Sequence, residues 1–82
     1  MIIDTHAHLD FPDYKSDLNS VLIRAKEADV GCIINVGTNL SASKKSVGLA
    51  HQFNNIYASI GIHPHDAMMV SEQDWKTLES LV

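Results

Sequence analysis

Three short apolar runs alternate along the chain with stretches in which apolar residues recur at helical spacing. The apolar runs lie near residues 2–8, 31–37 and 56–62, and a helical stretch follows each of them. Alternation of strands with helices is typical of parallel βαβ units. No linker or low-complexity tract interrupts the pattern. We therefore predict an α/β fold in which residues 1–82 belong to a single domain.

Each predicted strand has one aliphatic face and one face that becomes polar or small toward its carboxyl end. Because strand side chains alternate, Asp4, His6 and His8 should share one face of the first strand, and Asn35 and Gly37 one face of the second. An open doubly wound sheet would be apolar on both faces. A (β/α) barrel, whose interior opens at the carboxyl ends of its strands, accounts for this pattern better.

Helix boundaries are indicated by capping residues. Gly31 stands just beyond the end of the first helical stretch, where a glycine is common. The second can be capped by Asn39 or Ser41. In the third, Ser71 and Asp74 have the spacing of a capping box. No Gly, Pro or basic residue marks the end of that last helix, which is what a truncated chain would show.

Composition excludes several classes of protein. A net charge of −4 and a pI near 5.6 disfavour a surface that coats nucleic acid or adheres to membranes, although an anion could still be held locally by a metal. The only cysteine, Cys32, lies in an apolar run and is expected to be a small buried thiol. No segment approaches a membrane-spanning length and the start lacks a basic signal region, so we expect a cytoplasmic protein.

His6 and His8 form the first candidate site. Two residues apart on a strand, their Cα atoms should lie about 6 to 7 Å apart with both imidazoles on one side. Two such nitrogens can converge on one cation, and imidazole suits Zn²⁺ and other transition ions. Asp4, one step deeper, is expected to support a ligand by hydrogen bonding rather than to bind the ion. An ordinary polar strand end is the alternative, which the shared face of the three residues disfavours.

His63 is the second candidate, at the end of the third predicted strand. Pro64 should stop the strand and hold His63 in an extended conformation facing the barrel mouth. The first and third strands flank the second, so they lie roughly 10 Å apart. We therefore expect His63 to donate a hydrogen bond to an anionic substrate rather than to share the ion of His6 and His8. Packing against a helix or plain solvation is the alternative for His63, and a plain surface pair is the alternative to a functional role for His65 and Asp66.

The NVGTN turn would place further polar groups at the same mouth: Asn35, Gly37, Thr38 and Asn39. Turns of this kind also serve only to connect a strand to a helix. The sequence contains no phosphate-binding P-loop, nucleophile elbow or dinucleotide fingerprint. A metal-activated water is the remaining chemistry that the motifs favour.

The ordered motifs DTHAHLD, NVGTN and GIHPHDA resemble the N-terminal part of the TatD family of metal-dependent deoxyribonucleases and related hydrolases. The resemblance implies a TIM barrel of the amidohydrolase superfamily that uses one or two divalent ions (Mg, Mn or Zn). It also implies phosphodiester hydrolysis of DNA, of the 3'-5' exonuclease kind, by a metal-activated water. By the same resemblance His6 and His8 are metal ligands, His63 lies near the substrate phosphate, and Asp4 is the acidic residue of the opening motif.

The family takes its remaining ligands, a glutamate, two histidines and an aspartate, from later strands that this sequence does not contain. A barrel has eight βα units in about 250 residues, and three are recognisable here. The resemblance therefore implies a truncated TIM barrel that is inactive alone, with DNA or another phosphodiester as substrate of the parent enzyme. Unpaired edges of the first and third strands would favour self-association.

Two other functions stay open. A phosphoesterase of the polymerase-and-histidinol-phosphatase type also begins with H-x-H, but usually continues with a Ser/Thr and Asp-Gly loop, whereas FPDYKSD follows here. The alternative from another class is a non-catalytic βα segment that binds a metal or a partner.

Overall fold

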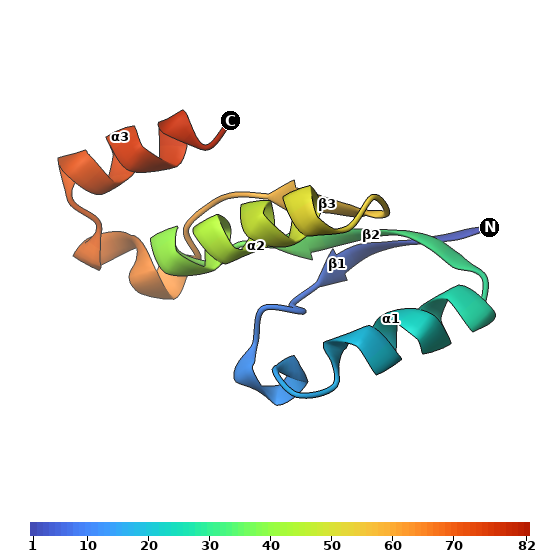
Figure 1. Ribbon diagram of the computed structural model, residues 1–82. Helices are drawn as coiled ribbons and strands as arrows, with labels where there is room; N and C mark the ends of the chain where they lie inside the picture. The colour runs from blue at the N-terminus through green and yellow to red at the C-terminus, as the bar shows by residue number, and fades with distance from the viewer.

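The computed structural model describes all 82 residues and confirms the predicted alternation of strands and helices (Figure 1). Two short 3-10 helices, η1 and η2, interrupt the loops that follow the first and third strands. The elements in chain order are β1 (Ile2–Ala7), η1 (Pro12–Tyr14), α1 (Leu18–Glu27), β2 (Val30–Val36), α2 (Leu40–Gln52), β3 (Ile56–Ser59), η2 (Pro64–Met69) and α3 (Glu72–Ser80).

The three strands form one parallel sheet in the order β1-β2-β3, and α1 and α2 cover the same face of it. The core lies beneath these helices, where Leu9, Ile33 and Ile56 are buried against Leu22 of α1 and Leu49 of α2. Sequential parallel strands with all crossover helices on one face are the topology of a (β/α) barrel, because a doubly wound sheet would carry helices on both faces. The predicted α/β class is confirmed.

The opposite face of the sheet is not covered by the chain. Tyr57 is 56% exposed there, and β1 and β3 have no further strand beside them. Cys32, expected to be buried, is only half-buried. Only nine of 82 residues are buried, so the core is small for a chain of this length. The helix α3 packs against α2, at the far end of the molecule from α1 (Figure 1).

Two of the three predicted helix boundaries are confirmed. The Asn39 side chain caps α2 by accepting a hydrogen bond from the Ala42 N–H, and Ser71 and Asp74 form both bonds of a capping box at α3. The prediction for Gly31 is wrong. The chain turns at Asp29 instead, which has a φ of 67°, and Gly31 lies inside β2.

The predicted strand faces are wrong for Asp4 and Asn35. In the pairing of β1 with β2, Asp4 lies opposite Ile33 and Ala7 lies opposite Asn35. The chain therefore advances three residues along β1 for two residues along β2. Such a bulge interrupts the alternation of side chains, and it places Asp4 on the same face as the buried Ile33. Asn35 is fully buried beneath the helices rather than facing the barrel mouth.

The strand β3 ends at Ser59, earlier than the predicted boundary at residue 62. Its partner β2 ends at Val36. Beyond this point the hydroxyl of Ser43 on α2 binds the backbone of Gly61. It accepts a hydrogen bond from the Gly61 N–H at 3.1 Å and donates one to the Gly61 carbonyl at 3.2 Å. A side chain of the covering helix therefore replaces the strand ladder at this point.

The close approach of α2 to the end of β2 requires a glycine at position 37. A Cβ on Gly37 would lie 2.7 Å from the Cα of Ser43, a backbone atom that cannot move without shifting α2. We expect Gly37→Ala to destabilise the protein by about 1 to 3 kcal/mol, the usual cost of overpacking. Gly48→Ala on the same helix is the control, because a Cβ there meets nothing within 4 Å. The control should stabilise by roughly 0.5 to 1 kcal/mol, and urea unfolding of both variants measures the difference.

Candidate functional site

The rings of His6 and His8 lie side by side where β1 ends. Their centroids are 5.0 Å apart and the planes meet at 78°, so the two imidazoles stand edge to face. The other face of His8 stacks on Phe11, at a centroid distance of 4.8 Å and an interplanar angle of 14°. The β strand and the loop after it therefore bring the two histidines together as the H-x-H spacing predicts.

A hydrogen bond determines which nitrogen of His8 is free. Its Nδ1 lies 3.1 Å from the carbonyl oxygen of Val36, at the end of β2. A carbonyl oxygen only accepts hydrogen bonds, so Nδ1 carries the proton. In neutral His8 the lone pair is therefore on Nε2, which is available to a metal. Histidine ligands commonly have their second nitrogen held in this way by a backbone carbonyl or carboxylate.

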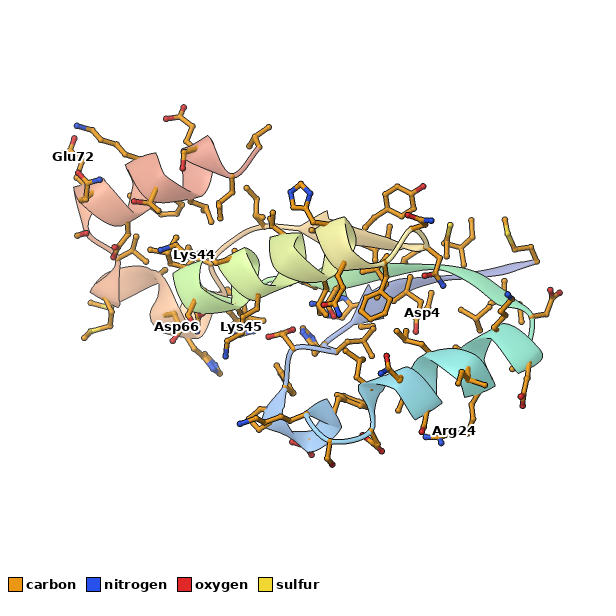
Figure 2. The ribbon with its side chains drawn as sticks, in the orientation of Figure 1. Asp4, Arg24, Lys44, Lys45, Asp66 and Glu72 are labelled. Atoms are coloured by element: carbon orange, nitrogen blue, oxygen red, sulfur yellow. The ribbon has the colours of Figure 1, made fainter.

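Asp4 supports the backbone of this pair. Its Oδ1 accepts a hydrogen bond from the N–H of His6 at 3.1 Å. In Figure 2, Asp4 lies between β1 and α1, as its pairing with Ile33 requires. Asp4 thus contacts the main chain of His6 rather than its ring.

His63 lies in the loop between β3 and η2, four residues beyond Ser59 and not at the end of the strand. Its backbone is extended, with φ −66° and ψ 145°, as expected before Pro64. The N–H of His63 donates to the carbonyl of Thr38 at 2.6 Å, which ties this loop to the NVGTN turn. The side chain is exposed.

The His63 ring has the opposite tautomer to that of His8. Its Nδ1 accepts a hydrogen bond from the backbone N–H of His65 at 3.1 Å. In neutral His63 the proton must therefore be on Nε2, which can donate to a ligand but has no lone pair for a metal. The Nε2 of neutral His8 can therefore bind a metal, whereas the Nε2–H of neutral His63 can donate a hydrogen bond.

An open groove of about 420 Å³ runs beside β1, lined by Asp4, His6, His8 and Phe11 together with apolar residues of α1. A larger cavity of about 510 Å³, near Val30 and Asn55, contains no histidine or carboxylate. Cavity volume therefore does not identify the site, and we place the site at the groove because both histidines of the H-x-H pair line it.

The chain supplies two imidazoles to this site and no complete ligand set. No group of three or more His, Cys, Asp or Glu side chains lies close enough to hold one ion. The oriented Nε2 of His8 and its neighbour His6 fit a metal, but two imidazoles alone rarely hold a catalytic ion.

None of the helices has the length and apolar character needed to cross a bilayer.

The predicted position of Asn35 at the barrel mouth is wrong. Its side chain is 0% exposed, and its amide oxygen and both amide N–H groups are hydrogen bonded. The sequence signal was its position within the apolar run CIINV, where a polar side chain must find buried partners.

Comparison with known proteins gives consistent matches over nearly the whole chain. A sequence model of the family described as TatD related DNase matches residues 3–82. The metal-dependent hydrolase YabD of Bacillus subtilis, described as uncharacterized, is 37% identical over 81 residues, covering 99% of this chain and 32% of that protein. The 3'-5' ssDNA/RNA exonuclease TatD of Edwardsiella piscicida is 32% identical over 82 residues, covering 99% and 32%.

The fold has a counterpart among solved structures. The crystal structure of YJJV, a TatD homologue from Escherichia coli K12, superposes with a TM-score of 0.87 and 34% sequence identity. The match covers 96% of this chain and 30% of that one. The three βα units therefore correspond to part of a TIM barrel, as predicted. The chain spans about a third of the length of the curated relatives it matches.

Proposed function

Because this chain belongs to the family of TatD-related DNases, we propose that His6 and His8 are the first two ligands of a divalent-metal-dependent phosphodiesterase. The observation that carries the proposal is the hydrogen bond from His8 Nδ1 to Val36, which leaves Nε2 available. Family membership also favours this function over that of a histidinol-phosphatase-type phosphoesterase. The remaining ligands would come from strands of the complete protein beyond these three.

The chemistry of the ligands limits the choice of ion. Relatives of this chain are named metal-dependent hydrolases, without a named metal. Imidazole nitrogens suit Zn²⁺, whereas Mg²⁺ and Mn²⁺ are better suited by carboxylate, carbonyl and water oxygens. When bound, one or two such ions supply a Lewis acid for the phosphoryl oxygen and lower the pKa of a water molecule. Asp4 contributes by holding the backbone of His6 through its N–H.

We assign His63 to the substrate. With Nδ1 occupied by the N–H of His65, its Nε2–H can donate to a phosphate oxygen. The strand order supports a separate role, because β2 lies between β1 and β3 and keeps these two strands about 10 Å apart. The hydrogen bond to Thr38 holds the loop in this position.

The proposed substrate is DNA, cleaved from its 3' end. The relative from Edwardsiella piscicida is named an exonuclease that acts on single-stranded DNA and RNA in the 3'-5' direction. A chain with a net charge of −4 does not attract a polyanion by its overall field. The positive charge of the ion and hydrogen-bond donors such as His63 would therefore hold the substrate at the site.

The function is tested by comparing the complete gene product with a protein of residues 1–82 alone. We expect the complete product to shorten a 5'-labelled single-stranded oligonucleotide from its 3' end. This activity should stop after EDTA treatment and recover with Mn²⁺ or Mg²⁺. Residues 1–82 alone should show no turnover with either ion, because two imidazoles do not fix a catalytic metal.

Two outcomes would contradict this proposal. The metal-dependent function is wrong if the complete product hydrolyses the oligonucleotide equally well in EDTA. The claim that residues 1–82 hold an incomplete catalytic site is wrong if hydrolytic activity co-purifies with residues 1–82 and disappears in their His6→Ala variant.

A further inference from the structure

A buried amide joins the end of β2 to the loop that follows the candidate ligands. The Nδ2 of Asn35 donates to Asp10 Oδ1 at 2.9 Å and to Ser46 Oγ at 2.6 Å, and its Oδ1 accepts from the N–H of Leu9 at 2.5 Å. The side chain of Asn35 is completely buried. Both of its N–H groups and its carbonyl oxygen are therefore used, and three separate segments meet at one side chain.

Two consecutive residues of β2 hold two consecutive residues of the loop. The carbonyl of Val36 accepts from His8 Nδ1, and the side chain of Asn35 binds the N–H of Leu9. The distance between His8 and Val36 therefore depends on how firmly Leu9 is held. Without that anchor the bond that orients the His8 ring can lengthen, and the imidazole can take either tautomer.

We propose that Asn35 is a positioning residue for His8, acting through Leu9 and Asp10 to keep the His8 Nε2 unprotonated and directed to the ligand position. The metal-binding part of this inference rests on the proposed function. The tautomer of His8 does not, since it can be read in metal-free protein.

The role requires an amide at position 35. In Asn35→Asp the carboxylate can still accept from Leu9, but it has no N–H for Asp10, and two carboxylates would lie against each other. Like charges at such a distance repel strongly in a buried site. Asn35→Ala instead leaves the N–H of Leu9 without a partner, which is costly when buried.

The structure provides a matched control on α2. Ser43 and Ser46 are both fully buried on this helix, but they bind different loops. Ser46 Oγ accepts from Asn35, whereas Ser43 Oγ bonds the backbone of Gly61 in the loop before His63. Ser43→Ala therefore removes the two hydrogen bonds of another fully buried serine on the same helix without touching the Asn35 cluster.

The test is nitrogen NMR of isotope-labelled histidine in the metal-free complete gene product, at about pH 8 where imidazole is neutral. Wild type and Ser43→Ala should show His8 protonated on Nδ1, whereas Asn35→Ala and Asn35→Asp should show a mixture of both tautomers. The dissociation constant for Mn²⁺ should rise about 10- to 100-fold in the Asn35 variants, the usual effect of losing a group that orients a ligand. It should change by much less in Ser43→Ala.

A wild-type His8 spectrum in a folded Asn35 variant would overturn the proposal. If the Asn35 variants do not fold, the same spectrum is read on Ser46→Ala, where partial loss of the Nδ1-protonated form is expected and an unchanged spectrum overturns the proposal. If the Asn35 variants show a mixture of His8 tautomers but the wild-type protein binds no Mn²⁺, the positioning role is supported and the proposed function is contradicted.

Discussion

Replacement of His8 by Ala should remove the divalent metal from the complete gene product and reduce its hydrolysis of DNA to the same extent. At this site only His8 has a ring nitrogen, Nε2, that is left free because the other nitrogen, Nδ1, is hydrogen bonded to the Val36 carbonyl. Loss of a ligand itself should weaken metal binding by more than the roughly 10- to 100-fold expected for loss of an orienting partner. His6→Ala should have the same effect, because its ring lies 5.0 Å from that of His8.

Elemental analysis of the purified variants, together with their turnover, measures this effect. His51→Ala is the control, since His51 is an exposed residue in the last turn of α2, outside both candidate loops. The ligand assignment is wrong if both the His6 and His8 variants retain their metal and their rate.

His63→Ala should leave the metal content intact and lower kcat/KM about tenfold to a hundredfold. A hydrogen bond to a charged oxygen contributes roughly 1.5 to 3 kcal/mol, and about 1.4 kcal/mol corresponds to a factor of ten. The prediction follows from the tautomer of His63, whose Nδ1 accepts from His65 and whose Nε2 therefore donates. Kinetics on a short single-stranded oligonucleotide and metal analysis of the same preparation are both required.

The neighbouring histidine supplies the matched control. The bond to His63 comes from the backbone N–H of His65, which remains in His65→Ala. That variant should therefore stay close to the wild type in kcat/KM. Metal lost in proportion to activity in His63→Ala would make His63 a ligand, and unchanged kinetics would reduce it to an exposed loop residue.

Features that depend on neighbours in sequence could be predicted. The cap of Asn39 on α2 and the capping box of Ser71 and Asp74 involve residues only three positions apart. The approach of His6 to His8 likewise involves residues only two positions apart. The α/β class likewise follows from the alternation of apolar runs with helical stretches.

Features that depend on distant partners could not be predicted. Asp4 lies on the helix-covered face because it pairs with Ile33, in a ladder whose register shifts both before and after Asp4, and that register exists only in the paired sheet. Asn35 is buried because Ser46, eleven residues later, and Leu9, twenty-six residues earlier, complete its hydrogen bonds. The strand β3 ends early because Ser43 of α2 binds Gly61. In each case the partner belongs to another element of secondary structure.

The central claim, that His6 and His8 hold a divalent ion, is tested most directly by anomalous scattering from crystals of the complete gene product grown with Mn²⁺. We predict an anomalous peak within metal–nitrogen bonding distance of the Nε2 of His8 and of a ring nitrogen of His6. The Nδ1 of His8 should remain bonded to the carbonyl of Val36. A peak bound elsewhere in the protein, or none at these two rings in an enzyme that hydrolyses DNA in the same solution, would contradict the account.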